Sequence, residues 1–174
     1  MRSVLCCGLL ALAVLGQAQG HDIKPAEALA KIDFMKGHWT GEQNFNTGGA
    51  PMVGTATDEV SEAIGGRYLE ERLSTTLPGR KPSDTRHFIT FDPAAGSYKA
   101  YWFNDSSVGA MELEGQMVGD SLVLTSKPTK TGAGQSSVMR ATYSSPSADK
   151  LVFKLELQQG DDWQLLFTST YSKK

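Results

Sequence analysis

The chain has 174 residues, a formal net charge of −2 and two cysteines, Cys6 and Cys7. Surfaces that bind polyanions normally carry an excess of Lys and Arg, so this charge argues against nucleic acid and anionic membranes as partners. Both cysteines lie in an apolar N-terminal segment, so the rest of the chain has no disulfide to supplement its hydrophobic core. About 150 residues remain beyond that segment, which suffices for one ordinary domain.

Residues 1–20 have the features of a secretory signal peptide. An arginine supplies a positive charge near the N-terminus, Leu5–Leu15 is almost wholly apolar, and small residues follow it. The apolar run is too short for a stable transmembrane helix. We therefore expect a periplasmic or secreted protein, cleaved after Ala18 or Gly20, with residues 21–174 forming a single domain and no membrane insertion.

The first element after this segment is predicted to be a helix over 24–35. Pro25 is a good first helical residue. Leu29, Ile32 and Met35 then recur with a spacing of three, which gives one apolar stripe. This pattern predicts a single helix of about two to three turns.

From Trp39 to the end of the chain the hydrophobic pattern has a period of two, which predicts β-strands. The predicted strands span 39–45, 52–64, 67–75, 85–91, 98–104, 108–117, 121–126, 136–144, 150–157 and 163–171. Short turns such as Gly65-Gly66 join them and no helix intervenes, so the sheet should be antiparallel. A meander of about ten strands has to close or split to protect its edges, and hairpins without long crossovers favour an up-and-down barrel.

The stretch Gly37-His38-Trp39 lies where the predicted helix meets the first strand. A glycine permits a sharp turn of the chain without a Cβ penalty. The indole of Trp39 then begins the strand as a large apolar plug for one end of the barrel. His38 alternates with Trp39 and should face outward.

Several short motifs occur along the chain in an order that is typical of a known family. They are Gly37-His38-Trp39-Thr40-Gly41, Gly65-Gly66-Arg67-Tyr68-Leu69-Glu70, Phe91-Asp92, Tyr101-Trp102-Phe103-Asn104-Asp105-Ser106 and Tyr171-Ser172-Lys173. Gly37-x-Trp39 resembles the opening signature of the calycin superfamily, which includes lipocalins, fatty-acid-binding proteins and nitrobindins. The full set resembles the bacterial family catalogued as domain of unknown function 1579.

The resemblance covers nearly all of the chain beyond the signal segment. It implies an all-β, calycin-like antiparallel barrel with an internal cavity, and it implies no known activity. In lipocalin-like barrels a cationic side chain from the last strand covers the indole that corresponds to Trp39. Lys173 would provide that cover here as a cation–π partner, so Gly37, Trp39 and Lys173 are expected to form the structural plug.

The chain has three histidines and shows no metal-binding spacing such as HExxH or a Cys pair. We therefore expect no metal and no cofactor. Nitrobindins hold haem in this kind of barrel through a histidine late in their chain, and this chain has none after His87. A haem would have to use His87 or a tyrosine. A strand histidine that is either satisfied by protein partners or partly exposed is the alternative for His87.

Polar positions on the predicted strands supply candidate ligand contacts: Arg72, His87, Trp102 and Arg140. If the strand faces that carry them point inward, Arg72 and Arg140 beside Trp102 would suit a ligand with an anionic head and an apolar body. If those faces point outward, the two arginines belong to the solvated surface. The sequence leaves both orientations open.

We expect the barrel to hold a small apolar or amphipathic molecule, because the strands alternate regularly and carry no nucleophile motif such as G-x-S-x-G. Paired acids such as Asp58-Glu59 diverge when they are adjacent on a strand, so we name no catalytic residue. Two alternatives stay open. One is an enzyme, a hydrolase or isomerase acting in the cavity, and the other is a structural module with a solid interior. The sequence does not determine the oligomeric state.

Overall fold

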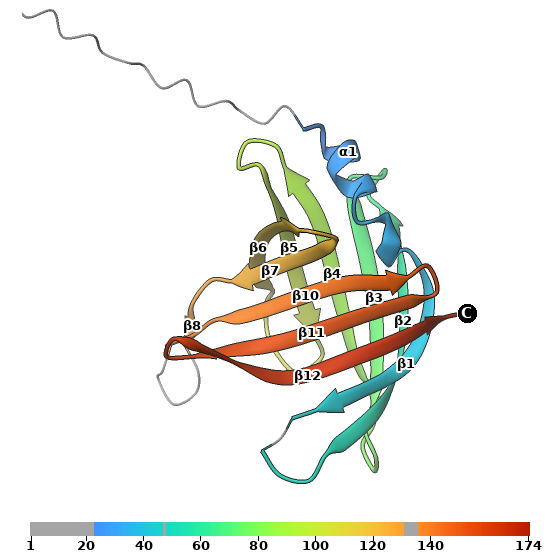
Figure 1. Cartoon of the computed structure of the whole chain (residues 1–174), viewed down its shortest axis with the longest axis vertical. Helices are drawn as coiled ribbons and strands as arrows, with labels where there is room; N and C mark the ends of the chain where they lie inside the picture. Colours follow the sequence, from blue (N-terminus) through green and yellow to red (C-terminus); the bar gives the residue numbers. More distant parts are fainter. Residues whose placement is uncertain (1–22, 47, 131–135) are drawn as a thin grey trace, which may run out of the picture.

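Ten antiparallel strands close into a barrel in this computed structural model, which describes residues 23–46, 48–130 and 136–174 (Figure 1). The barrel strands are β1 (Gly37–Phe45), β2 (Met52–Ala63), β3 (Tyr68–Thr76), β4 (Ser83–Asp92), β5 (Ser97–Asn104), β6 (Met111–Val118), β7 (Ser121–Ser126), β10 (Met139–Ser147), β11 (Lys150–Gln159) and β12 (Asp162–Lys173). Pairing of β1 with β12 closes the sheet and leaves the barrel without an open edge. The predicted up-and-down barrel is therefore confirmed.

A small two-stranded ribbon departs from the predicted meander. It consists of β8 (Thr129–Lys130) and β9 (Ser136–Ser137) and lies between β7 and β10 in the sequence. The predicted strand over 136–144 is thus two strands, of which only β10 joins the barrel. The predicted loop over 127–135 lies partly, and the predicted signal peptide wholly, outside the described residues.

The helical segment is shorter than predicted. It consists of α1 (Pro25–Ala30) and a separate 3₁₀ helix at Asp33–Met35. The break lets the chain turn into β1, and the apolar stripe of Leu29, Ile32 and Met35 is still fully buried. Both described helices are too short to cross a membrane.

The turn between β2 and β3 is longer than the predicted Gly65-Gly66 hairpin. Ala63 pairs with Tyr68, so four residues form the connection. Ile64 shares the left-handed conformation of the two glycines, with φ of 52°. A second departure is a bulge in β12, where Leu155 pairs with Phe167 but Glu156 pairs with Leu165. The bulge leaves Leu165 37% exposed, whereas simple alternation predicts that it faces inward with Phe167.

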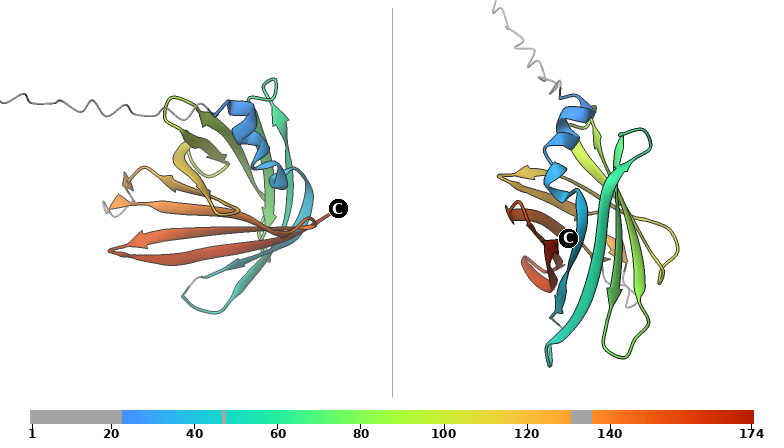
Figure 2. Two further views of the ribbon diagram at one scale, coloured as in Figure 1. Left: turned by 45° about the horizontal axis from the view of Figure 1, so that its top comes forward. Right: turned by 90° about the vertical axis from the view of Figure 1, so that its right-hand side faces the viewer.

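The helical segment lies across the end of the barrel at which β1 begins (Figure 2). There Trp39 is 1% exposed and its Nε1 donates a hydrogen bond to the carbonyl of Met35 at 2.8 Å. The Lys173 ammonium lies 5.3 Å from the centroid of the indole. Gly37 has φ of +139°, and a Cβ at this position would meet the Lys173 side chain at 3.0 Å. The structure thus brings Gly37, Trp39 and Lys173 together at the covered end.

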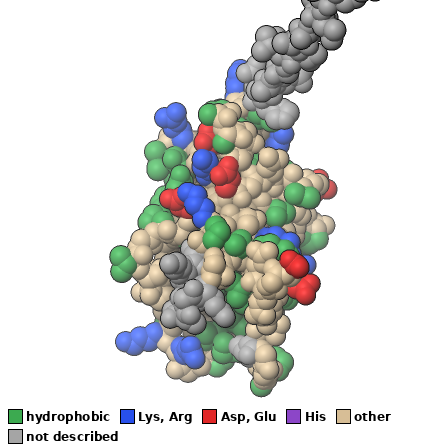
Figure 3. Space-filling model, turned by 90° about the vertical axis from the view of Figure 1, so that its left-hand side faces the viewer, with side chains coloured by type: hydrophobic (Ala, Val, Ile, Leu, Met, Phe, Trp, Pro, Cys, Tyr) green, Lys and Arg blue, Asp and Glu red, His purple; other side chains and the backbone are tan. Residues whose placement is uncertain are grey.

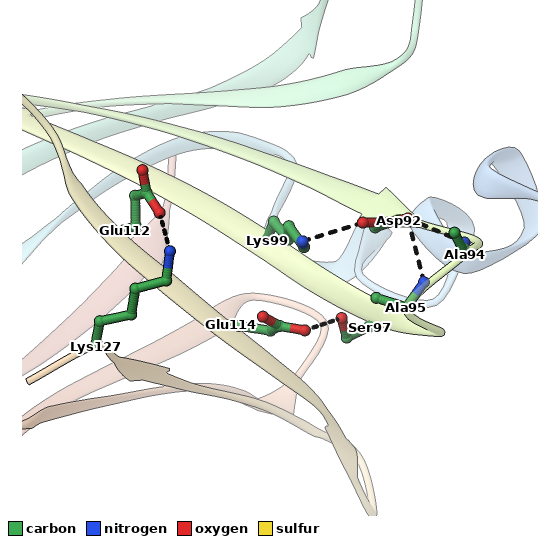
Figure 4. A network of polar contacts seen from close by, with 8 residues as sticks. All are labelled: Asp92, Ala94, Ala95, Ser97, Lys99, Glu112, Glu114 and Lys127. Carbon is green, nitrogen blue, oxygen red and sulfur yellow. Dashed lines mark hydrogen bonds and ion pairs between the residues drawn. The ribbon is translucent and has the colours of Figure 1, made fainter.

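The outer face of β4 to β7 carries short-range polar contacts between side chains of opposite charge (Figure 4). Lys127 contacts Glu112 at 2.6 Å and Lys99 contacts Asp92 at 3.0 Å. Exposed pairs of this kind contribute little to stability, because water screens them. On another face of the molecule basic and acidic side chains are also interspersed (Figure 3). These contacts fit a solvated outer surface.

Candidate functional site

The barrel encloses a cavity of about 430 Å³ at the strand ends remote from α1. This volume lies within the range of about 300–1,000 Å³ that is usual for small-molecule pockets. Most of the cavity wall is apolar, and its main side chains are Phe45, Leu73, Met111, Phe153, Leu155 and Phe167. The cavity argues against the alternative of a structural module with a solid interior.

His87, Trp102 and Gln43 line the cavity with almost fully buried polar or aromatic side chains, which are 3%, 5% and 3% exposed. His87 on β4 pairs with Trp102 on β5, and both side chains point inward. Their rings stack with centroids 4.2 Å apart and an angle of 18° between the planes. Two of the four residues predicted from the sequence as ligand contacts therefore line one cavity.

Arg72 does not line this cavity. On β3 it alternates with the buried residues Glu71 and Leu73, so its side chain lies on the outer face and is 47% exposed. Its Nη2 donates to Glu70 at 2.9 Å, and Arg86 approaches the other oxygen of the same carboxylate at 2.6 Å. The inward orientation considered for Arg72 is therefore wrong.

Arg140 also lies outside the cavity, because on β10 it alternates with the buried Ala141. Its guanidinium forms a two-pronged contact with Glu156, at 2.7 and 2.9 Å, and lies 4.1 Å above the ring centroid of Trp163. This second inward orientation is also wrong. The contact with Glu156 and the outer strand face explain why the Arg140 side chain lies outside the cavity.

A buried acidic side chain, Glu71, lies beside His87. It occupies the inward face of β3 between Leu69 and Leu73 and is 3% exposed. Its Oε2 lies 2.5 Å from His87 Nδ1 and accepts a hydrogen bond from the hydroxyl of Tyr143 at 2.8 Å. Glu71 therefore holds the imidazole and the phenol in fixed positions.

A second buried carboxyl, Asp58, lies near Glu71. It points inward from β2 and is 3% exposed, and neither of its oxygens meets a donor among the described residues. Burial, and next the neighbouring Glu71 carboxylate, raise the pKa of Asp58 to about 9. Asp58 is therefore protonated at neutral pH and can donate its proton to Glu71. The two carboxyls then share a single negative charge.

The two tyrosines of this cluster stay neutral. Burial raises the pKa of Tyr143 well above its usual value, and the Glu71 carboxylate adds to this shift. Burial likewise raises the pKa of Tyr171, with a further contribution from Asp58. The phenol of Tyr143 therefore acts as a hydrogen-bond donor to Glu71.

The donors around Glu71 determine the tautomer of His87. An ionised carboxylate only accepts hydrogen bonds, so the 2.5 Å contact places a proton on Nδ1. In the neutral ring the other nitrogen, Nε2, then carries the lone pair. Nε2 makes no hydrogen bond within the described part of the chain. The imidazole of His87 thus has one nitrogen held by the protein and one available at the cavity.

Four residues of this cluster were not predicted as site residues from the sequence: Asp58, Glu71, Tyr143 and Tyr171. The signal for Glu71 was present, because it shares its strand face with Leu69 and Leu73. The side chains of the adjacent acids Asp58 and Glu59 diverge, as expected. Because they diverge, one of them, Asp58, points inward. The described residues hold no group of three or more His, Cys, Asp and Glu side chains that could bind a metal ion.

These features define a closed antiparallel β-barrel with a cavity at one end and a buried acid–base cluster beneath it. The chain belongs to the family described as "Protein of unknown function (DUF1579)", whose profile matches residues 24–173. No curated protein matches the chain in sequence.

Among solved structures, the crystal structure of Rv2717c from M. tuberculosis is similar to this chain. The sequence identity is 15% and the TM-score is 0.63, with 88% of this chain and 99% of that chain covered. At this identity the likeness shows a common fold alone.

Proposed function

We propose that this barrel binds one small amphipathic molecule, with the apolar body of the ligand in the 430 Å³ cavity. The observation that carries the proposal is the composition of the cavity wall, which is mostly apolar and also carries polar side chains such as His87, Arg80 and Lys81. Each 100 Å² of apolar ligand surface removed from water contributes about 2.5 kcal/mol. Part of this gain offsets the lost freedom of the ligand, so polar contacts decide which amphipathic molecule binds.

Two cations at the cavity rim are candidates for contact with an anionic head group. Arg80 and Lys81 lie in the connection between β3 and β4, line the cavity and are exposed. Neither forms an ion pair with an acidic side chain of the described residues. They take the place that sequence analysis considered for Arg72 and Arg140.

Titration with an environment-sensitive fluorescent fatty acid tests this proposal. We expect a Kd near micromolar and binding roughly 3- to 10-fold weaker in the Arg80→Ala/Lys81→Ala variant, because two partly screened charge contacts are lost. Arg72→Ala and Arg140→Ala are the matched controls, since both side chains lie on the outer face and binding should not change.

The methyl ester of the same fatty acid supplies a second control. It has no anionic head, so wild type and the double variant should bind it equally. An absence of binding by both compounds would contradict the proposal, and equal weakening of both compounds would contradict the role of the rim cations.

A second candidate ligand is haem, and one observation favours it. Glu71 holds Nδ1 of His87 at 2.5 Å and leaves Nε2 available, which is the usual arrangement of a histidine that ligates a metal. His87 would supply the axial ligand and the haem would supply redox and gas-binding chemistry. Titration with haemin decides between the candidates, because a Soret band that is lost in His87→Ala would favour haem.

We also propose that the protein is exported and acts in the periplasm or outside the cell. The supporting feature is the N-terminal sequence, with its apolar run of 5–15 followed by small residues. Mass spectrometry of the protein recovered from its exporting host should give a chain that begins at Gln19 or His21. Retention of residues 1–18, or a lipid adduct, would contradict this proposal.

A further inference from the structure

We propose that the part of the cavity at His87 is a general acid–base site, at which His87 accepts a proton from the bound molecule through Nε2 and returns it. Glu71 is the positioning residue that holds the imidazole. This inference rests on the proposed function, because a ligand has to enter the cavity. It adds an activity to binding.

The buried carboxyl cluster is costly for the fold. Glu71 and Asp58 are each 3% exposed inside a barrel whose other inward side chains on these strands include Leu69, Leu73 and Val60. Burying a carboxylate is strongly unfavourable unless it is well compensated, and an apolar side chain would fill the same place without that cost. Clusters of this kind concentrate at functional sites.

The orientation of His87 suits proton transfer to a bound molecule. The Glu71 carboxylate accepts the hydrogen bond from Nδ1–H, so the lone pair of the ring is on Nε2. His87 lines the cavity while Glu71, Asp58 and Tyr143 do not. Within this cluster, His87 is therefore the residue that can accept a proton from a bound molecule.

The surroundings of His87 also suit the charged form that proton transfer creates. An imidazolium would be hydrogen-bonded to the Glu71 carboxylate and stacked on the indole of Trp102, whose ring centroid is 4.2 Å away. The titratable groups that face this position are Asp58 from β2, Glu71 from β3, Tyr143 from β10 and Tyr171 from β12. Their one shared negative charge attracts the imidazolium.

The class of reaction that fits is a proton shift within an apolar carbonyl compound. A C–H bond next to the carbonyl breaks, its electron pair moves into the carbonyl to give an enolate, and the proton goes to Nε2 of His87. Return of that proton to another position completes an isomerisation with no oxidant, reductant or other co-reactant. The amide of Gln43, which is buried in the wall of the same cavity, can donate to the carbonyl oxygen.

Deuterium exchange tests this inference without knowledge of the natural substrate. The full chain is incubated with 2-decanone in D₂O, and NMR follows the loss of protons from the carbons next to the carbonyl. A positioned general base contributes roughly 100- to 10,000-fold. We therefore expect exchange at least about 100-fold faster than with free imidazole at the same concentration, and saturating fatty acid should block it.

Two variants separate the roles of the residues. His87→Gln should reduce exchange to the level without protein. Glu71→Gln should reduce exchange at least about 10-fold while the ketone still binds, because an amide can donate to Nδ1 and stabilise the opposite tautomer. Displacement of the fluorescent fatty acid measures ketone binding in each variant, and Arg72→Ala is the control that should match wild type.

The outcomes distinguish this inference from the proposed function. Equal exchange in wild type and His87→Gln, with the ketone bound, would overturn the acid–base site and leave the binding function intact. Binding of the fatty acid but not of the ketone would overturn the carbonyl substrate class. Binding of neither would overturn both proposals. If His87→Gln does not fold, exchange by wild type that persists under saturating fatty acid overturns the inference by itself.

Discussion

Replacing Trp39 with alanine is expected to lower the free energy of unfolding by about 3–5 kcal/mol. The indole is 1% exposed and fills the end of the barrel beneath α1, so its removal leaves a cavity that the surrounding strands cannot close. The substitution also removes the hydrogen bond to the Met35 carbonyl and the contact with Lys173. Chemical denaturation of the two proteins measures the difference.

Two further variants act as controls for Trp39→Ala. Trp163 lies on the outer face over Arg140, and Trp163→Ala should change stability by about 1 kcal/mol or less. Trp39→Phe keeps most of the apolar volume and loses the hydrogen bond, so its effect should be intermediate. Because Trp39 lies away from the cavity, fatty-acid affinity in the folded variant should change less than stability. A melt of Trp39→Ala that matches wild type would contradict the role of Trp39 as the plug.

The stability of the wild-type protein is expected to fall as the pH rises from 5 to 8, and Asp58→Asn should remove most of this dependence. The pKa of Asp58 is about 9 in the folded protein and 3.8 for an unperturbed Asp. Between these values the folded protein keeps a proton that the unfolded chain has released. Stability therefore declines with rising pH, by up to about 1.4 kcal/mol per pH unit.

An asparagine side chain in place of Asp58 would be neutral at every pH, and its amide could still donate to Glu71. The variant should therefore have a flatter profile and be more stable than wild type at pH 8. Asp120→Asn is the matched control, because Asp120 is exposed in the turn between β6 and β7 and its loss should leave the slope unchanged. Denaturation curves at several pH values measure how the free energy of unfolding changes with pH. Equal changes in wild type and Asp58→Asn would contradict the buried, protonated state of Asp58.

The strands, the turns and the alternation of faces could be predicted from the amino-acid sequence without the structure. Strand 121–126 was predicted with its observed bounds, and the other barrel strands within a few residues, because the side-chain period and the turn residues are local properties. The alternation also predicted the outward face of His38 and the opposite faces of Trp102 and Phe103. The closed barrel followed from the hairpins, because closure protects both edges of such a sheet.

Only the folded barrel shows which strand faces line the interior and which residues meet there. Arg72 and Glu71 are neighbours in sequence, yet one contacts solvent and the other His87, because the core takes the face that carries Leu69 and Leu73. The members of the buried cluster come from four strands and lie up to 85 positions apart in the chain: Asp58, Glu71, His87 and Tyr143. Their meeting depends on the closure and register of the barrel, and no local pattern of side chains contains that information.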